Sequence, residues 1–390
     1  MREDFLLLNP GPVPLTRAVR DAMSEPMVSH RSEEFEAVYE RAQDALDTVF
    51  ERSTPGESLT SEGGTSLLLN GTATMGMEAA VANLVSSDSS VVAVINGKFG
   101  RRFKRIADRH ASVMPVEFEW GEPVDVSRVA SAVEESTDVV TMVHNETSTG
   151  LLNPVEAVGE IARDHDAWFV VDGVTSIGGD EFRMDDWSVD IAVTDGQKCL
   201  AGPPGISALY VTDRVLSGID GENAPFYEDL DWHRRKAEDH QTPFTSAVPL
   251  FRGFATALEA VVEEGMNHRI ERHRRQARAF REGFVSMGLD SFPRRNEESA
   301  YSNTVTAISL PEDIRGEKSG AFFDAVTERG VSISGGQAHL GGDIFRVSNM
   351  GNLRDQQILR GIRTVGESFE SVGVDVDLQS GLDAARAVLE

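Results

Sequence analysis

Short apolar runs follow one another through the first half of the chain, and each has the length of a β-strand. They occupy residues 67–69, 91–95, 139–143, 168–171, 191–193 and 208–211. Helix-like stretches separate most of them. Strands that are apolar on both faces and alternate with helices are typical of a parallel sheet covered on both sides. The pattern predicts a large α/β domain with a mostly parallel sheet sandwiched by helices.

The flanking segments have other patterns. Prolines and a glycine impose an extended, turning path on residues 6–14, which is typical of an arm. Apolar residues at helical spacing predict a half-buried helix over 33–51 and one long helix from Pro249 to about Met287. A smaller α/β unit follows, with strands expected at 304–309, 331–333 and 344–347 and helices at 320–329 and 353–372.

The length of the chain exceeds the roughly 250–300 residues at which a single core stops growing. We therefore expect an N-terminal arm over residues 1–20, a large domain over 21–255 and a small α/β C-terminal domain over 256–390. The small domain is expected to complete the substrate site.

Chemically distinctive side chains follow several apolar runs where each run would end as a strand. Ligands bind outside the carboxyl ends of parallel strands, so these positions are where a site would form. The positions carry a small-residue turn at Thr72, Ala73 and Thr74, an aromatic at Phe99, a hydroxyl cluster around Thr147, an acid at Asp172 and a lysine at Lys198. Each alone has an ordinary explanation as a helix cap, core aromatic, turn residue or surface lysine. Their coincidence at one sheet edge favours a site.

Lys198 directly follows the apolar segment 191–193 and a short polar turn. A lysine that acts as a covalent nucleophile must be partly desolvated, so that its amine loses a proton at working pH. The end of a buried strand provides that setting. We therefore expect Lys198 to carry the central chemistry of the site.

The net charge of −27, from 64 acidic and 37 basic residues, excludes two classes of partner. Nucleic acid and an anionic membrane surface would both be repelled. Cys199 is the only cysteine, which rules out an intramolecular disulfide and favours a reducing, cytoplasmic setting. Residues 1–4 lack the basic start of a signal peptide, and the apolar stretch after them is too short to span a membrane.

One cofactor, pyridoxal 5′-phosphate, explains the set of edge residues, because its phosphate, ring faces, phenolic oxygen, ring nitrogen and aldehyde each need such a group. The chain resembles the class V aminotransferases of pyridoxal-phosphate fold type I, and within them the alanine–glyoxylate and serine–pyruvate aminotransferase group. The motifs that carry the resemblance are LLLNPGP, NGTATMGME, NGKFGRR, HNETSTG, VVDGV, DGQKCLAGPPG, QTPFT and FRV. They span nearly the whole chain, and the resemblance implies a seven-stranded sheet in the large domain.

The resemblance also implies roles for the edge residues around the cofactor ring. Lys198 forms the Schiff base, and Asp172 pairs with the pyridinium nitrogen. Phe99 stacks on one face of the ring, Val174 packs on the other, and Thr147 lies near the phenolic oxygen. No metal is part of this expected site.

The phosphate and substrate contacts follow from the same resemblance. Thr72, Ala73, Thr74 and Gln197 would hold the phosphate, and Arg346 would bind the substrate carboxylate as a planar guanidinium fork. The arm from Asn9 to Gly11 would close over the substrate. Members of the family are homodimers with shared sites, so Thr245, with Thr242 as the second candidate, is expected to reach the phosphate of the neighbouring subunit.

The chain departs from the family pattern at two positions. Ala73 stands where glycine is common in the phosphate turn, and Gln241 stands where an aromatic often contacts the cofactor phosphate. Neither change removes a role that the chemistry requires.

The implied activity is transfer of an amino group from a small L-amino acid, namely alanine, serine or aspartate, to a 2-oxo acid such as glyoxylate or pyruvate, by a ping-pong mechanism. The alternatives are an aminoethylphosphonate transaminase, a kynureninase-like or desulfurase-like lyase, or a non-catalytic protein that binds pyridoxal phosphate. A desulfurase needs a mobile catalytic cysteine, whereas Cys199 adjoins Lys198 on the same segment.

The strong acidic excess and the scarcity of lysine predict a halophilic protein, kept soluble where salt screens its self-repulsion. The free energy of unfolding is therefore expected to rise between low and molar potassium chloride, as measured by chemical denaturation. A stability that stays flat or falls over this range would contradict the hypothesis.

Overall fold

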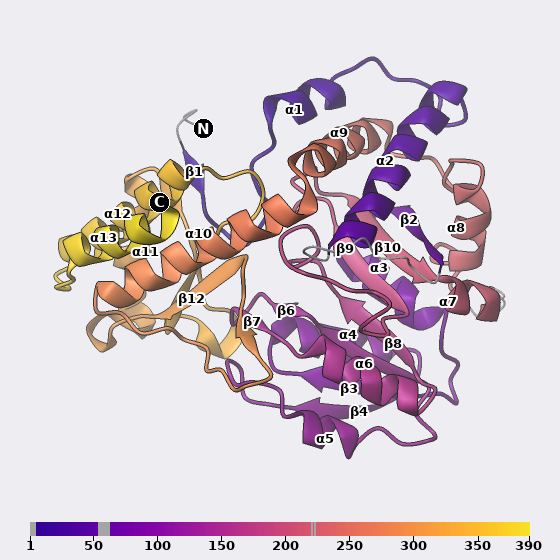
Figure 1. Cartoon of the computed structure of the whole chain (residues 1–390), viewed down its shortest axis with the longest axis horizontal. Coiled ribbons are helices and arrows are strands. Elements are labelled where there is room, and N and C mark those ends of the chain that lie inside the picture. Colours follow the sequence, from indigo (N-terminus) through magenta and orange to yellow (C-terminus); the bar gives the residue numbers. More distant parts are fainter. Residues whose placement is uncertain (1–4, 54–62, 220, 222–223) are drawn as a thin grey trace.

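A seven-stranded sheet forms the centre of the larger lobe in the computed structural model, which describes residues 5–53, 63–219, 221 and 224–390 (Figure 1). Residues 1–4, which argued against a signal peptide, lie outside the described part. The strand order is β2-β10-β9-β8-β5-β3-β4. Within this sheet β10 pairs antiparallel with β2 and β9, and the other pairs are parallel. The predicted fold class is confirmed.

All the predicted apolar runs are strands of this sheet. Their bounds are β2 (Gly64–Asn70), β3 (Ser90–Ile95), β5 (Val139–Val143), β8 (Trp168–Asp172), β9 (Ile191–Asp195) and β10 (Ile206–Thr212). The sequence pattern missed the edge strand β4 (Ser112–Glu117). Pro115 interrupts the apolar residues of this strand, so the sequence shows no continuous apolar run. In the fold, only Val116 is buried, and Met114 is 56% exposed. Edge strands also tolerate a proline such as Pro115, which an interior strand does not.

Helices pack against the sheet and supply the rest of the first core. The helix predicted over 33–51 is present as α2. The helices of this lobe are α1 (Arg17–Met23), α2 (Glu33–Arg52), α3 (Ala73–Ala82), α4 (Lys98–Ala107), α5 (Val126–Ala130), α6 (Val155–Asp164), α7 (Asp213–Gly218), α8 (Leu230–Ala237) and α9 (Val248–Glu264). Helix α3 contacts β9 and β10, while α4 contacts β3 and β5. These contacts bring the N-termini of α3 and α4 to the carboxyl edge of the parallel strands.

The expectation of one helix from Pro249 to Met287 was wrong. The chain forms α9 and then α10 (Met266–Ser286), separated at Gly265. Gly265 has φ +82°, a left-handed conformation that glycine adopts readily and that ends a helix. Helix α10 then runs between the lobes: Ile270 lies in the first core and Phe280 in the second.

The second lobe has its own core around a three-stranded antiparallel sheet of order β12-β15-β14. The predicted strands and helices are present as β12 (Val305–Ser309), β13 (Val331–Ser332), β15 (Ile344–Ser348), α11 (Ser319–Glu328) and α12 (Asp355–Ser371). The pattern did not predict β14 (Ser334–Gly335), α13 (Leu378–Leu389) or the 3₁₀ turns at Glu312–Ile314, Gly316–Lys318 and Ala338–Leu340. The start of the chain joins this lobe, because β1 (Leu6–Leu7) pairs parallel with β13. Figure 1 accordingly shows β1 beside the helices of the second lobe.

A small sheet of order β11-β7-β6 joins the two halves of the chain. Strands β6 (Asn145–Glu146) and β7 (Leu151–Leu152) belong to the segment after β5, whereas β11 (Ala300–Tyr301) precedes the second core. This pairing fixes the hydroxyl-rich loop between β6 and β7 relative to the second lobe.

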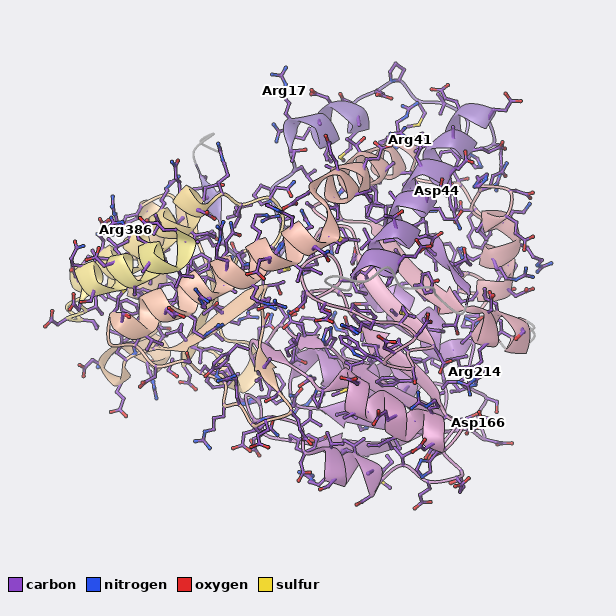
Figure 2. The ribbon with its side chains drawn as sticks, in the orientation of Figure 1. Arg17, Arg41, Asp44, Asp166, Arg214 and Arg386 are labelled. Atoms are coloured by element: carbon purple, nitrogen blue, oxygen red, sulfur yellow. The ribbon has the colours of Figure 1, made fainter. Side chains whose placement is uncertain are left out.

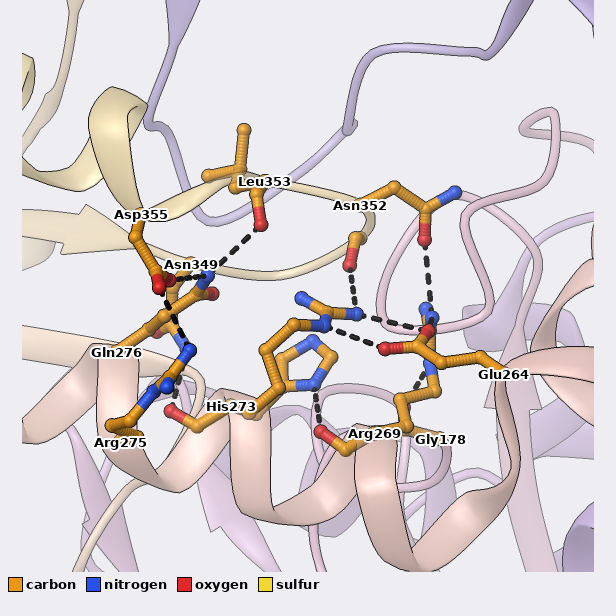
Figure 3. Close-up of polar contacts among 12 residues, drawn as sticks. Gly178, Glu264, Arg269, His273, Arg275, Gln276, Asn349, Asn352, Leu353 and Asp355 are labelled. Carbon is orange, nitrogen blue, oxygen red and sulfur yellow. Dashed lines mark hydrogen bonds and ion pairs between the residues drawn. The ribbon is translucent and has the colours of Figure 1, made fainter. Parts of the chain in front are cut away.

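A fully buried arginine ties α10 to the segment that carries the candidate lysine. Arg269 is 0% exposed, and its guanidinium donates to the Gly178 carbonyl and pairs with the Glu264 carboxylate (Figure 3). The same guanidinium also donates to the Cys199 carbonyl. A buried charge is tolerated only where it finds such partners. Because Cys199 follows Lys198 directly, the contact fixes the lysine segment against the long helix.

Charged side chains spread over the outside of the molecule (Figure 2). Some form surface ion pairs, such as Arg214 with Asp166 at 2.7 Å and Arg41 with Glu259 at 2.7 Å. Exposed pairs of this kind each contribute about 0–1 kcal/mol, so they do not determine the fold. Within the described ranges, no helix combines the length and the apolar character that crossing a bilayer requires.

Candidate active site

A cavity of about 280 Å³ opens at the carboxyl edge of the large sheet. That volume is near the lower end of the roughly 300–1,000 Å³ of small-molecule sites. Its wall consists of Thr72, Ala73, Thr74, Met77, Phe99, Arg102, Thr147, Asp172, Val174, Thr175, Asp195, Gln197 and Lys198. Thus every residue predicted to contact the cofactor lines this cavity except Thr245. A larger cavity of about 600 Å³, lined by groups such as Asp47 and Arg234, contains none of the predicted residues.

Lys198 lies in the turn after β9, with its amine directed at the N-terminal arm. Nζ donates a hydrogen bond of 2.5 Å to the carbonyl oxygen of Pro10. Burial lowers the pKa of Lys198 below its ordinary value, and the charges of Asp195 and Asp172 partly oppose that shift. A desolvated amine of this kind loses its proton more readily than a surface lysine.

Asp172 is the last residue of β8 and is 5% exposed. Its Oδ1 accepts a hydrogen bond of 2.9 Å from the Val174 amide. Burial raises the pKa of Asp172 to about 7; the Val174 amide, Arg102 and Lys198 lower it, whereas Glu146 raises it further. A carboxylate this poorly solvated is suited to pairing with a cationic ring nitrogen, which would restore its charged form.

The N-terminus of α3 lies at one end of the cavity, where the Ala73 amide donates 2.7 Å to the Asp195 carboxylate. Thr72 is the N-cap residue, yet its side chain makes no capping hydrogen bond. Thr74 Oγ1 accepts 2.9 Å from Arg102 Nη1, and Gln197 Oε1 is buried without a partner among the described residues. A helix N-terminus with spare polar groups attracts an anion, so this end of the cavity fits a phosphate.

Phe99 is held at the start of α4 by a buried carboxylate. Glu146 is 0% exposed, and its Oε2 accepts from the amides of Phe99 at 3.0 Å and Gly100 at 3.2 Å. On the other side, the Arg102 guanidinium lies 4.9 Å from the centre of the Phe99 ring. The aromatic ring is therefore oriented by its backbone and by a cation, as a stacking platform must be.

A chain of hydroxyl groups lines the opposite wall. Thr147 Oγ1 lies 2.9 Å from Thr175 Oγ1, and the Asn145 amide donates to Thr175 Oγ1 at 2.9 Å. Val174, next to Thr175, adds an apolar patch to the same wall. Oriented hydroxyls beside an apolar contact suit a ring that carries a phenolic oxygen.

Arg346 lies on β15 behind Thr147 and is 3% exposed. Nη1 donates 2.9 Å to the Thr147 carbonyl, while Nε and Nη2 donate 3.1 and 2.8 Å to the Gly335 carbonyl. Burial lowers the pKa of Arg346 to about 10, and Glu146 acts in the opposite direction. A guanidinium has five N–H donors, so it keeps donors beyond these three contacts.

The arm lies against the lysine. The Asn9 amide donates 2.9 Å to Ser334 Oγ in the second lobe. Gly11 has φ +86°, and a Cβ there would lie 2.5 Å from Lys198 Nζ. Glycine is therefore needed for the arm to approach the amine this closely.

The segment predicted to reach a neighbouring subunit points away from this cavity. Thr245 is exposed, and its carbonyl accepts 3.4 Å from Asn70 Nδ2. Thr242 is 1% exposed and uses its hydroxyl to donate 2.9 Å to the Phe244 carbonyl. Gln241 is bound by Arg31 at 2.8 Å, so it too is engaged outside the cavity.

The sequence pattern missed four residues of the cavity wall: Met77, Arg102, Thr175 and Asp195. Arg102 could have been found from its spacing, because it lies three residues after Phe99, and positions i and i+3 share a helix face. Asp195 ends β9 just as Asp172 ends β8, and this parallel was the available signal.

Comparison with known proteins agrees with this geometry. Residues 7–344 match the family model for aminotransferase class-V. The chain is 34% identical to an uncharacterized aminotransferase of Methanocaldococcus jannaschii, over 98% of this chain and 97% of the relative. It is 31% identical to the L-aspartate–glyoxylate aminotransferase of Paracoccus denitrificans, over 97% and 94%.

A solved structure with the same overall arrangement is the ureidoglycine–glyoxylate aminotransferase of Bacillus subtilis. It is 29% identical and covers 99% of this chain and 98% of its own, with a TM-score of 0.88. By the family model and these full-length similarities, the chain belongs to the class V aminotransferases, which are pyridoxal-phosphate-dependent enzymes of fold type I.

Proposed function

We propose that this aminotransferase moves an amino group from a small L-amino acid, namely alanine, serine or aspartate, to a 2-oxo acid, with glyoxylate as the first acceptor to test and pyruvate as the second. The observation that carries the proposal is the meeting of Lys198 and Asp172 in one cavity with a helix N-terminus and an aromatic platform. Relatives named as aspartate–glyoxylate and serine–glyoxylate aminotransferases support the choice of substrates.

Each group has a place in the proposed reaction. When bound, the cofactor supplies a ring that accepts electrons from the substrate α-carbon. Asp172 keeps the ring nitrogen protonated, and Lys198 Nζ binds the cofactor at rest. With the substrate in place, the Nζ of Lys198 would take the proton from the substrate α-carbon as general base and give it back as general acid. Arg346 holds the substrate carboxylate behind Thr147.

The thiol next to the lysine argues against a desulfurase. Cys199 is 0% exposed, and burial raises its pKa to about 12. A catalytic cysteine works as an exposed thiolate, so a buried neutral thiol cannot supply this chemistry. The buried contact of the Cys199 carbonyl with Arg269 also keeps this segment in place.

The Lys198→Ala variant is expected to lose the visible absorbance of the lysine-bound cofactor and to slow turnover by about 10²–10⁴-fold, because the proton-transfer group is gone. The measurement is absorbance of the cofactor-loaded protein together with steady-state rates for each donor with glyoxylate. Lys236→Ala, on the surface helix α8, is the matched control and should behave like the wild type. Full turnover of Lys198→Ala would contradict the proposal.

A second experiment identifies the donor. The cofactor-loaded wild type is mixed separately with alanine, serine and aspartate, and its absorbance is followed as the cofactor becomes aminated. The true donor should convert it, and added glyoxylate should reverse the change, as a ping-pong mechanism requires. Absence of conversion with all three would contradict the proposed donors.

The raised pKa of Asp172 predicts how the cofactor-free protein responds to pH. A carboxyl whose folded pKa of about 7 exceeds its unfolded value contributes stability at low pH and loses it as pH rises through the folded pKa. Asp172→Asn has no carboxyl to ionise at this position, so it does not lose stability in this way as pH rises. The cofactor-free variant should therefore exceed the wild type at about pH 8 by on the order of 2–4 kcal/mol in free energy of unfolding, and by less near pH 5.

Urea denaturation at both pH values measures this difference, and the same variant should bind pyridoxal phosphate more weakly. Asp375→Asn changes an exposed carboxyl and is the control, with no comparable effect of pH. If Asp172→Asn and wild type lose stability in parallel as pH rises, Asp172 is not the buried acid that this role needs.

We also propose that the enzyme is a homodimer in which Thr245 contacts the cofactor phosphate of the neighbouring subunit. Two observations support a partner at this surface. Thr245 is exposed, and Phe226, whose ring contacts Trp232 and Phe244, is 75% exposed. Exposed aromatic groups of this kind mark protein–protein contacts.

Light scattering of the wild type should give the mass of a dimer. Thr245→Ala should stay dimeric but bind pyridoxal phosphate several-fold more weakly, with no change for pyridoxal, which lacks the phosphate. Thr242→Ala is the control and should leave the preference for the phosphate unchanged. A monomeric wild type, or equal effects on both ligands, would contradict the shared site.

A further inference from the structure

Asp195 places a second carboxylate at the phosphate end of the cavity. It is the last residue of β9, is 1% exposed and lines the same wall as Lys198. Its Oδ2 accepts a hydrogen bond of 2.7 Å from the backbone amide of Ala73. Its Oδ1 is buried without a direct hydrogen bond among the described residues. Burial raises the pKa of Asp195, while the Gln197 side chain and the amides of Ala73 and Gly196 favour its charged form. The carboxylate is therefore fixed to the helix through Oδ2, with Oδ1 enclosed beside Gln197 and Gly196.

The amide that Asp195 occupies belongs to the proposed phosphate site. Ala73 is the first residue of α3, and the N-cap residue Thr72 leaves the amides of this helix uncapped by its own side chain. The first amides of a helix are the donors that bind phosphate oxygens. Asp195 reaches this amide from a strand 122 residues further along the chain, so it fills the place of an anion at the helix N-terminus.

The charges near Asp195 do not remove the conflict with a phosphate. The positive charge of Lys198 favours the charged form of Asp195. Lys198 must lose that charge to bind the cofactor, because only its neutral amine can react. Arg102 is engaged with Thr74 and with the Phe99 ring. A carboxylate and a phosphate that compete for one amide repel each other in a cavity with little water.

We propose that Asp195 competes with the cofactor phosphate for the N-terminus of α3, so that its charge weakens the preference of this protein for pyridoxal phosphate over pyridoxal. The inference rests on the proposed cofactor site and adds a specificity-determining residue to it. On loading, the carboxylate gives up the Ala73 amide to a phosphate oxygen. Without cofactor, it caps the helix in place of the phosphate.

The Asp195→Asn variant separates charge from shape. Its amide oxygen can still accept from the Ala73 amide, so the cap is kept while the negative charge is removed. Cofactor-free wild type and variant are titrated with pyridoxal phosphate and with pyridoxal, and visible absorbance gives the two dissociation constants. Because both ligands react with the same lysine, their ratio reports the phosphate contact alone.

The ratio of the pyridoxal constant to the pyridoxal phosphate constant should rise about tenfold or more in Asp195→Asn, the equivalent of roughly 1.4 kcal/mol. The pyridoxal constant itself should stay near the wild-type value. Inorganic phosphate should also raise the melting temperature of the cofactor-free variant more than that of the wild type. Asp190→Asn, just before the start of the same strand, is the matched control and should leave the ratio unchanged.

An unchanged or lower ratio in Asp195→Asn would overturn the inference and leave Asp195 as a helix cap that supports phosphate binding. If that variant does not fold, Asp195→Ser tests the same ratio with a smaller neutral acceptor. If the wild type binds neither ligand, the proposed cofactor site fails and the inference fails with it. If the wild type binds pyridoxal phosphate and pyridoxal with the spectrum of a lysine adduct, but the ratio of the two dissociation constants is unchanged in Asp195→Asn, only the inference about Asp195 fails. The proposed function then still holds.

Discussion

The burial of ionisable groups at the carboxyl edge of one parallel sheet is the constraint on which the rest of this structure depends. Asp172 and Asp195 end neighbouring strands, and Lys198 lies in the turn after the second of them. Burial opposes the charged form of all three, so each needs partners that a folded chain must bring to it. The same desolvation lowers the pKa of Lys198 and raises that of Asp172, as the proposed roles of the two residues require.

The supporting contacts come from buried polar groups distant in sequence. The Glu146 carboxylate accepts from the Phe99 and Gly100 amides and so orients Phe99, while the Arg269 guanidinium donates to the Cys199 carbonyl next to Lys198. Both side chains are fully buried, so each would be unfavourable without its partners. They fix the platform and the lysine from opposite sides, and this fixed geometry gives the cavity its chemistry.

The two lobes meet beside the cavity, next to Thr147. Arg346 comes from the second lobe and binds the Thr147 carbonyl of the first, while the arm crosses from β1 to place Pro10 on the Lys198 amine. A change in the position of one lobe would therefore move the proposed carboxylate site relative to the lysine. At the phosphate end of the proposed site, Asp195 is bound to the N-terminus of α3 through the Ala73 amide.

The sequence by itself determined the sheet, because apolar runs of strand length indicate strands buried on both faces. It also determined Lys198, Asp172 and nearly all of the other residues at the carboxyl edge of the sheet, because parallel strands present their carboxyl ends together. Tertiary structure alone decided that Asp195 takes the Ala73 amide, that Arg102 covers Phe99, and that Thr245 faces outward. It also decided the break at Gly265 and the exposed edge strand β4. These features depend on packing between distant segments, and local periodicity reports burial but not which partner a buried group meets.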